Sequence, residues 1–501
     1  MMSHRSGPLY RALPFVGLIL FFSACAVVNF RGLRTNPPGF FLDESSIAYN
    51  AATISQSGRD EDGALWPVYF RAFGEYKNPL YIYLLAAVFK VTGPSILGAR
   101  ILSATLGLLA SVFVGLLAFL ISRRISIGIL MGTIALFTPW LFEISRLVFE
   151  VALFPLMLVL FLLQVYLLFR KAEWSWGREF LLALTLGLVT YTYSIGRLFG
   201  PLMAVGLLFF RPQVRVTHIL RIWFFYFLSL IPLLAFHFSH PGALFQRFGT
   251  ISYLSDNISI GEKVSQFLTH VLGNIDPRSL LMSGDPNPRH HIQGMGSFFV
   301  FVFILSLYGI YWCVRYQRND PWWRFVLYGL VVSVIPASLT QDLFHTLRLI
   351  PYPIFLLILA IPTLNSLMRD RPRLSWRWAL FTCLIVGTAF EMVSFQKLYA
   401  QDGPNRGGSF EAEFPNVFDA ALSVGSRSIF IVESGGPLYI HAYWYGLLHN
   451  LDHSRLIRVP DDSSVAPGSA VLTYQYVPEG CLTVRNEGRY TAYVCQKESK
   501  R

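Results

Sequence analysis

The chain has 501 residues, of which 54% are hydrophobic and only 14% are charged. Soluble globular proteins carry about 25% charged residues, so this composition excludes an ordinary soluble enzyme and indicates an integral membrane protein. The net charge of +12 does not indicate a nucleic-acid partner, because Lys and Arg stand in short clusters between apolar segments rather than along one polar face.

Eleven apolar segments approach the length of about 20 residues that a bilayer-crossing helix needs. They are residues 13–30, 98–121, 126–142, 147–169, 180–196, 198–210, 222–239, 297–314, 323–339, 350–367 and 376–394. No small-x-small cleavage site follows the first segment, so we interpret it as a retained helix rather than a signal peptide. The predicted fold class is an α-helical polytopic membrane protein with about eleven transmembrane helices.

Basic residues at the segment ends fall on one side of the membrane when successive helices alternate in direction. They are His4, Arg5, Arg11, Arg123, Arg124, Arg170, Lys171, Arg178, Arg211, Arg215, Arg221, Arg315, Arg318, Arg369, Arg371, Arg373 and Arg377. The positive-inside rule makes this side cytoplasmic. We therefore expect a multi-pass inner-membrane protein with a cytoplasmic N-terminus, and with the loops 31–97 and 240–296 and the tail 396–501 outside.

The first outer loop contains two predicted interfacial helices. The first begins at Asp43, a residue type that favours the N-cap position, and carries apolar residues at helical spacing up to Gly58. The second begins at Pro79, a favoured first-turn residue, and its tyrosines suit the headgroup zone. The two helices are expected to present Asp43, Glu44 and Lys77 at the depth of a lipid phosphate.

More cations stand near helix ends on the same outer side. A cation at that depth is costly unless it snorkels, pairs with an acid or binds an anion. Taken singly, snorkelling or pairing with Glu143, Glu150 or Asp342 explains each one equally well. Four arginines together, opposite to the positive-inside bias, favour an anion site. The cations are Arg100, Arg146, Arg197, His345 and Arg348.

In this order the features resemble the C-type glycosyltransferases that use polyprenyl-phosphate sugars, in particular the aminoarabinose-transferase-like and protein-mannosyltransferase-like group. The resemblance covers residues 1–395 and is strongest over 40–106. One departure is Asn78, where the family usually has the first proline of Lys-Pro-Pro-Leu. The matching segments are Leu42 to Glu44, Ile47 to Asn50, Gly58 to Glu61, Tyr76 to Tyr81, Ala99-Arg100, Ser145-Arg146, Tyr193 to Arg197 with Pro201, and His345 to Pro353.

The resemblance implies transfer of a sugar from a polyprenyl-phosphate carrier to a hydroxyl or amine of a lipid, glycan or protein. Such a reaction needs a base for the acceptor and cations for the departing phosphate. Asp43 is the candidate base by this resemblance, unless it is only a helix cap, and Glu44 is expected to orient it or to contact the sugar. The candidate donor-binding residues are Lys77, Arg100, Arg146, Arg197, His345 and Arg348.

No cofactor is firmly implied, and a divalent metal stays an open question. Asp285, His290 and His291 are metal-ligand types in the second large outer loop, but spacing fixes no third ligand. We therefore favour a solvated loop edge over a metal site. The sequence contains no glycine-rich phosphate motif and no zinc-spaced cysteines, so nucleotide-dependent chemistry is not indicated.

The tail differs in composition from the bundle, and we predict a small extracytoplasmic α/β domain over 396–501, after a transmembrane glycosyltransferase domain over 1–395. Two short β-prone runs flank Asn486 to Gly488 and predict a hairpin that brings Cys481 opposite Cys495. A disulfide there requires an oxidising compartment. Two buried thiols on neighbouring strands are the alternative.

Two other function classes stay open at this stage. A secondary transporter is also polytopic, but transporters usually show internal repeats and charged sites near the membrane midplane. A polymerase or ligase that joins glycans from lipid carriers uses similar chemistry of phosphate departure. The charges at one face and the absence of a repeat in the sequence favour the transferase.

Overall fold

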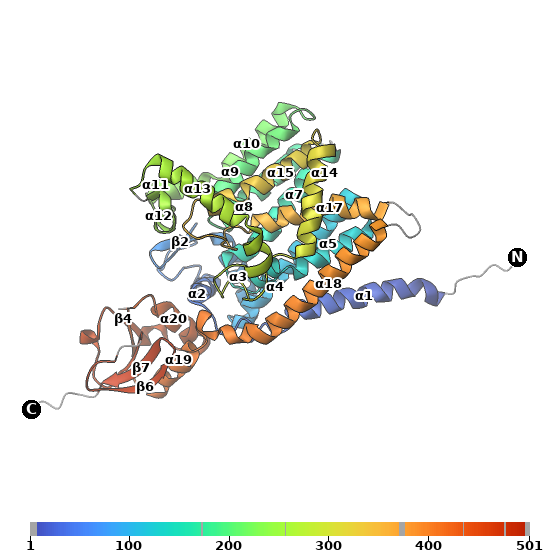
Figure 1. Ribbon diagram of the computed structural model, residues 1–501. Coiled ribbons are helices and arrows are strands. Elements are labelled where there is room, and N and C mark those ends of the chain that lie inside the picture. Colours follow the sequence, from blue (N-terminus) through green and yellow to red (C-terminus); the bar gives the residue numbers. More distant parts are fainter. Residues whose placement is uncertain are drawn as a thin grey trace, which may run out of the picture.

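The computed structural model describes residues 8–171, 174–255, 257–369, 376–433, 435–474 and 477–495. The chain forms a large helical bundle followed by a small mixed sheet near the C-terminus (Figure 1). Four of the basic residues used to predict orientation lie outside the described residues. They are His4, Arg5, Arg371 and Arg373.

Within the described residues, five helical segments are long and apolar enough to cross a bilayer. They are Ile96–Ser122 in α4 (Ile96–Ser122), Glu150–Arg170 in η1 (Glu150–Leu153) and α7 (Phe154–Lys171), Val216–Ser239 in α10 (Val216–Ser229) and α11 (Ile231–Ser239), Pro351–Met368 in α17 (Pro351–Arg369), and Trp378–Ser409 in α18 (Trp376–Asp402) and η5 (Gly403–Ser409). The segments in α7 and α17 are mostly buried, whereas those in α10 and α18 expose most of their apolar side chains.

The remaining bundle helices fall outside this set of five. They are α1 (Pro8–Phe30), α5 (Ile125–Phe137), α6 (Pro139–Ile144), α8 (Trp176–Thr192), α9 (Gly196–Gly206), η2 (Leu207–Phe210), α14 (Val300–Tyr316), α15 (Pro321–Val332) and α16 (Ile335–Ser338). Each of the eleven predicted segments overlaps a helix, so the multi-pass helical class is confirmed. The number of eleven crossings stays a prediction.

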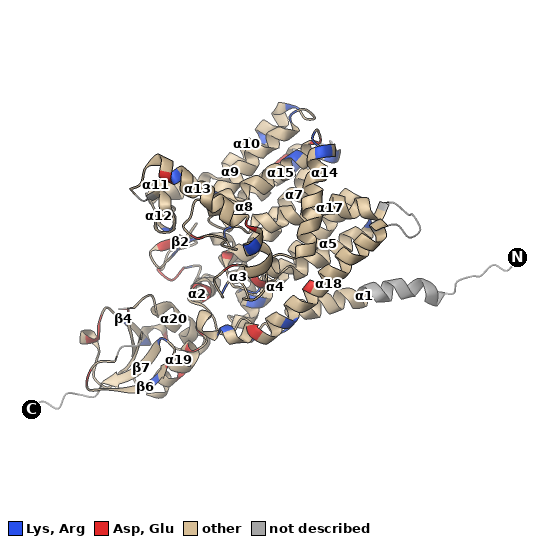
Figure 2. Ribbon diagram, viewed as in Figure 1, with Lys and Arg blue, Asp and Glu red and all other residues tan. Residues whose placement is uncertain are grey.

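The helix ends that carry the basic clusters meet at one end of the bundle. Arg124 Nη1 donates to the carbonyl of Met368 at 2.9 Å, which joins α5 to α17. Arg170 Nη2 pairs with Asp320 Oδ2 at 2.7 Å and joins α7 to α15. Figure 2 shows basic residues at the far end of α10 and between α14 and α15. This grouping agrees with helices that alternate in direction.

Both helices expected in the first outer loop are present, as α2 (Leu42–Ser57) and α3 (Pro79–Thr92). The predicted N-cap residue is wrong: α2 begins at Leu42, and its N-cap residue is Phe41 rather than Asp43. Glu44 Oε2 instead accepts the N–H of Phe41 at 2.8 Å, which leaves the Asp43 side chain free for another partner. A short hairpin of β1 (Phe70–Ala72) and β2 (Glu75–Lys77) precedes α3 and ends at Lys77.

The second outer loop is also ordered into short elements. They are α12 (Gln246–Ile251), η3 (Tyr253–Ser255), α13 (Ile260–Asn274) and η4 (Ser279–Ser283). The chain then turns at Gly284, which has a φ of +69°, and a Cβ atom there would lie 1.9 Å from the His291 ring. Only glycine fits this turn, and it brings the following Asp285 back against the bundle.

The tail forms the expected α/β fold. Its sheet has the strand order β4-β3-β5-β7-β6, in which β3 pairs in parallel with β4 and β5, while β7 pairs antiparallel with β5 and β6. Cys481 and Cys495 lie opposite each other and form the predicted disulfide. The elements are η6 (His453–Arg455), η7 (Asp462–Ser464), β3 (Ile429–Val432), β4 (Leu456–Val459), β5 (Ala470–Tyr474), β6 (Cys481–Glu487) and β7 (Tyr490–Cys495), with α19 (Phe414–Ser423) and α20 (Tyr439–Leu448).

The tail packs directly on the helix that carries Asp43. Helix α20 contacts α2, and the Ser45 hydroxyl lies 2.8 Å from His441 Nδ1 in a fully buried contact. The other ring nitrogen of His441 contacts Glu411, which also pairs with Arg489. None of these four residues lines the cavity described below, so we interpret their contacts as a connection that fixes α2 against the tail.

Candidate functional site

Helix ends and loops at one end of the bundle enclose a cavity of about 1220 Å³. It lies at the opposite end of the bundle from the basic clusters, since its lining residues come from α2, β2, α9, the second outer loop and the segment before α17. Five residues predicted from sequence line it together. They are Asp43, Lys77, Arg197, His345 and Arg348.

Asp43 and Lys77 form an ion pair in the cavity. Lys77 Nζ lies 2.5 Å from Asp43 Oδ1, with the lysine side chain 8% exposed and the aspartate side chain 33% exposed. Burial would raise the pKa of Asp43, but Lys77, assisted by Arg247 and Arg289, holds that pKa below its ordinary value. Asp43 is therefore a carboxylate near neutral pH, the form that accepts a proton.

Asn78 fixes the backbone immediately after Lys77. Its N–H donates to a carboxylate oxygen of Glu150, and its side-chain oxygen accepts a hydrogen bond from Arg197 Nη2 at 3.1 Å. Proline at this position could not donate a hydrogen bond. The departure from the family pattern thus replaces the rigidity of a proline ring with two polar contacts.

Three further arginines line the cavity, and two of them were not predicted. Arg348 Nη1 contacts Asp342 Oδ2 at 2.6 Å. Arg247 Nη1 lies 3.2 Å from a carboxylate oxygen of Glu75. The Arg289 guanidinium lies over the Phe41 ring at 3.7 Å, and it forms no ion pair with the carboxylates of the described residues. For Arg247 and Arg289, the only signal in the sequence is positive charge in the loop 240–296.

One wall of the cavity is apolar. Besides the cationic residues, the lining includes leucines from α9, α10–α11 and the neighbouring loops. This wall includes Leu198, Pro201, Leu230, Leu233 and Leu234. The cavity therefore combines cations, a carboxylate and an apolar surface, which suits a ligand with a phosphate and a hydrocarbon chain.

Glu44 does not line the cavity. It is fully buried, and besides the Phe41 N–H it accepts the N–H of Val148 at 2.9 Å through Oε1. Burial raises the pKa of Glu44, although Arg100 opposes the shift. Its contacts fix the start of α2, so of the two roles expected for Glu44 its geometry suits orientation of Asp43 and not contact with a sugar.

Arg100 and Arg146 are also absent from the cavity lining. Arg100 is fully buried and donates to the carbonyls of Leu33, Pro37 and Gly39 at 3.2, 2.7 and 2.6 Å. Arg146 is 2% exposed, and it likewise donates to backbone carbonyls within residues 28–36. The structure corrects the expectation that these two face a donor phosphate: both guanidinium groups are occupied by the connection between α1 and α2.

The predicted solvated edge around His290 is wrong. Asp285, His290 and His291 are 2%, 5% and 0% exposed. His291 turns away from the cavity: its Nδ1 lies 3.2 Å from Glu143 and its Nε2 donates to the carbonyl of Met295. Burial alone would lower the pKa of His291, but Glu143 raises it.

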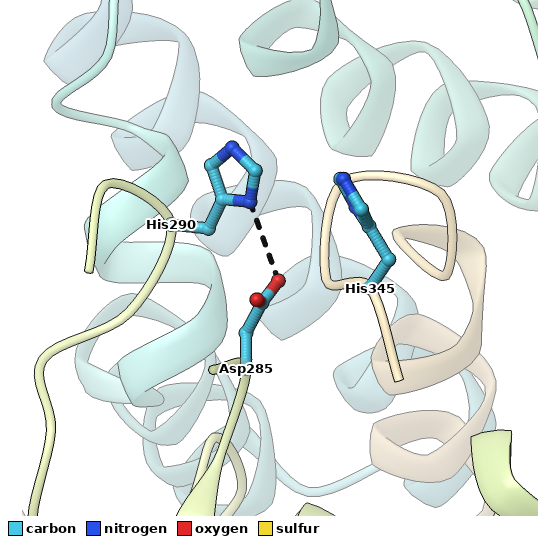
Figure 3. Close-up of side chains that lie close together, drawn as sticks. All are labelled: Asp285, His290 and His345. Atoms are coloured by element: carbon cyan, nitrogen blue, oxygen red, sulfur yellow. Dashed lines mark ion pairs between the residues drawn. The ribbon is translucent and has the colours of Figure 1, made fainter. Parts of the chain in front are cut away.

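The structure brings His345 to Asp285 and His290 instead of His291. One potential ligand atom from each of these three residues lies within 4.8 Å of the others. Figure 3 shows the two imidazole rings and the carboxylate converging from separate loops. All three residues line the cavity that contains Asp43.

No family model matches the sequence, and no curated protein matches it. Solved structures do match its fold. The crystal structure of ArnT from Cupriavidus metallidurans bound to undecaprenyl phosphate has a TM-score of 0.62 and 12% identity, covering 95% of this chain and 97% of that protein. The apo crystal structure of the same protein has a TM-score of 0.61 and 11% identity, covering 96% and 98%. The resemblance to the aminoarabinose-transferase-like group is thereby confirmed for the fold.

Proposed function

We propose that the protein is a membrane glycosyltransferase that moves a sugar from a polyprenyl-phosphate carrier to a hydroxyl or amine acceptor on the outer face of the membrane. The observation that carries this proposal is a single cavity with an ionised Asp43, several cations and an apolar wall. These are the three surfaces that a lipid-linked sugar phosphate and its acceptor require. The shared fold with a protein crystallised with undecaprenyl phosphate adds support.

In the proposed reaction Asp43 accepts the proton of the acceptor hydroxyl or amine. The acceptor atom then forms a bond to C1 of the sugar while the bond between C1 and the phosphate oxygen breaks, and polyprenyl phosphate departs with that electron pair. Since Lys77 contacts Asp43, an incoming phosphate competes for Lys77. Donor binding thereby releases Asp43 to act as the base.

The departing phosphate gains negative charge, which the cavity cations stabilise. We assign this role to Lys77, Arg289 and Arg348, with Arg197 acting on it directly or through Asn78. Glu44, Arg100 and Arg146 are positioning residues, because they fix the segment that leads into α2.

The proposed orientation has the N-terminus in the cytoplasm, eleven crossings, and the cavity and the tail outside. Division into a transmembrane unit over 1–395 and a tail domain over 396–501 belongs to the same proposal. The Cys481–Cys495 disulfide supports an oxidising compartment for the tail. Impermeant alkylation of intact spheroplasts after reduction tests this: labelling of both cysteines is expected, and protection of both would place the tail in the cytoplasm.

Incubation of the purified protein with polyprenyl-phosphate sugars tests the activity. Release of free polyprenyl phosphate together with a glycosylated acceptor is the expected result. Release of polyprenyl diphosphate would favour the glycan polymerase or ligase instead. Uptake of a solute into vesicles without turnover would favour a transporter. A panel of donor sugars in the same assay identifies the sugar that moves.

A further inference from the structure

We propose that Asp285, His290 and His345 form a binding site for one divalent transition-metal ion, Zn²⁺ or Mn²⁺, with an open coordination position that faces the cavity. The three residues come from two loops that are far apart in sequence. Asp285 and His290 follow η4, and His345 lies between α16 and α17. Their potential ligand atoms lie within 4.8 Å of one another, so small side-chain shifts would bring all three to one ion (Figure 3).

One ring nitrogen of each imidazole has no hydrogen-bond partner among the described residues. His290 is 5% exposed, and its Nδ1 lies 3.4 Å from Asp285 Oδ2, beyond ordinary hydrogen-bond length. The Nδ1 atoms of His290 and His345 are both buried, and neither has a hydrogen-bond partner among the described residues. A buried polar atom without a partner costs about 1 to 3 kcal/mol, and coordination of a metal would remove this cost.

The carboxylate is held in place by its neighbours. Thr346 donates to Asp285 Oδ2 through both its N–H and its hydroxyl at 2.8 Å, and Asn287 donates its N–H to Oδ1 at 2.9 Å. Outer-shell hydrogen bonds of this kind orient metal-binding carboxylates. Thr346 is the residue after His345, so one turn of chain fixes two members of the cluster.

The backbone before His345 is strained. Phe344 has a φ of +50°, a conformation that costs energy for a bulky residue. Its N–H is held by Asn274 Oδ1 at 3.0 Å, and its ring packs on Trp140. The surroundings therefore enforce a conformation that directs His345 toward Asp285 and His290.

The chemistry of the ligands indicates the ion. Two imidazoles and one carboxylate suit Zn²⁺ and Mn²⁺ better than Mg²⁺ or Ca²⁺, which prefer oxygen ligands. Three protein ligands leave a position for substrate or water, as in catalytic metal sites. Arg289 and Arg348 line the same cavity, so a phosphate oxygen from the donor would fill that position and balance the positive charge. This last step rests on the proposed function.

Metal titration of the full-length protein tests the site without requiring turnover. The detergent-purified protein is freed of metal with a chelator and titrated with Zn²⁺ and then with Mn²⁺ by calorimetry. One equivalent should bind, and His290→Gln and His345→Gln should each weaken binding at least about 10-fold. The control His237→Gln changes a histidine of the same cavity outside the cluster and should bind as the wild type does.

X-ray absorption of the Zn²⁺-loaded wild type does not depend on variants that fold. It should show two imidazole ligands and no sulfur. The absence of saturable binding, a first shell without two imidazoles, or wild-type affinity in both cluster variants would each overturn the metal site.

Polyprenyl phosphate affinity, measured with and without Zn²⁺, tests the role of the open position. Tighter binding in the loaded protein is expected, and equal affinity would overturn the phosphate contact. Metal binding in a protein that never turns over any donor would overturn the proposed function while leaving the metal site in place. The two proposals therefore fail separately.

Discussion

Two groups of arginines that look alike in the sequence have different surroundings in the structure. Arg100 and Arg146 are buried and donate to backbone carbonyls at the end of α1 and between α1 and α2. Arg289 and Arg348 line the cavity beside Asp43. A cation deep in a membrane protein needs an anion or several carbonyls. Arg100 and Arg146 use carbonyls. In the second group, Arg289 and Arg348 face a cavity that a ligand can enter.

Arg100 and Arg146 also affect the cavity, because they hold the segment that leads to Asp43. The carbonyls bound by Arg100 and Arg146 belong to the segment that enters α2, and Glu44 fixes the first turn of that helix. Asp43 lies in the same turn and contacts Lys77. We therefore propose that Arg100 and Arg146 position the base, whereas Arg289 and Arg348, which line the cavity, contact the donor.

The largest effect on activity is expected from replacement of Asp43, the carboxylate that the first group of arginines positions and that the second group lies beside. Asp43→Asn should lower turnover by about 10²- to 10⁴-fold without unfolding the protein, because the amide keeps the shape of the side chain but cannot accept a proton. Single-turnover transfer from a polyprenyl-phosphate sugar measures it. Asp62→Asn, in the exposed turn after α2, is the control. Turnover near that of the wild type would eliminate Asp43 as the base.

Replacement of a buried arginine should affect stability. Arg146→Met leaves several buried carbonyls without a donor, at about 1 to 3 kcal/mol each, so we expect a strongly lowered unfolding temperature in detergent. Arg289→Met should leave that temperature nearly unchanged. The distinction between the two groups of arginines would be wrong if Arg146→Met had the unfolding temperature of the wild type and lost phosphate binding instead.

Replacement of a cavity cation should weaken donor binding. Arg348→Gln and Arg289→Gln each remove a charge-assisted contact to phosphate worth about 1.5 to 3 kcal/mol, or roughly 10- to 150-fold in affinity. Equilibrium binding of polyprenyl phosphate measures the change. Arg324→Gln, far from the cavity over the Phe209 ring, is a matched control. Unchanged affinity in both cavity variants would place the phosphate elsewhere.

The smallest effect expected is a shift in pH dependence. Lys77 holds the pKa of Asp43 below its ordinary value, so the base stays ionised and transfer should persist under mildly acidic conditions. Lys77→Met removes that charge while burial remains, so the pKa of Asp43 should rise, and the loss of kcat/KM on acidification should begin at higher pH. An acid limb at the same pH in both proteins would exclude Lys77 as the cause.

Local patterns in the sequence predicted much of the fold. Apolar runs marked every main helix of the bundle, and turn residues between β-prone runs marked the hairpin that joins Cys481 to Cys495. The cap of α2 was misplaced by two positions, because a backbone N–H bound to Glu44 competes with the preference of Asp43 for a cap.

Charge and residue type alone did not separate cavity residues from buried ones. Asp43, Lys77, Arg197, His345 and Arg348 were found because they follow a family-like order along the chain. Arg289 and Arg247 were missed because their loop has no periodic pattern. His290 was read as solvated because its partner His345 lies in a distant loop that packs over it.

The sequence by itself determined the class of protein, the positions of its helices and the disulfide of the tail, because hydrophobic period, turn chemistry and composition act over a few neighbouring residues. Only the tertiary structure decided which polar side chains meet. Asp285 and His345 are brought together by loops that pack across the bundle, while Arg146 is turned away by carbonyls more than 100 residues earlier in the chain. Such choices depend on burial and partner geometry, which no local pattern encodes.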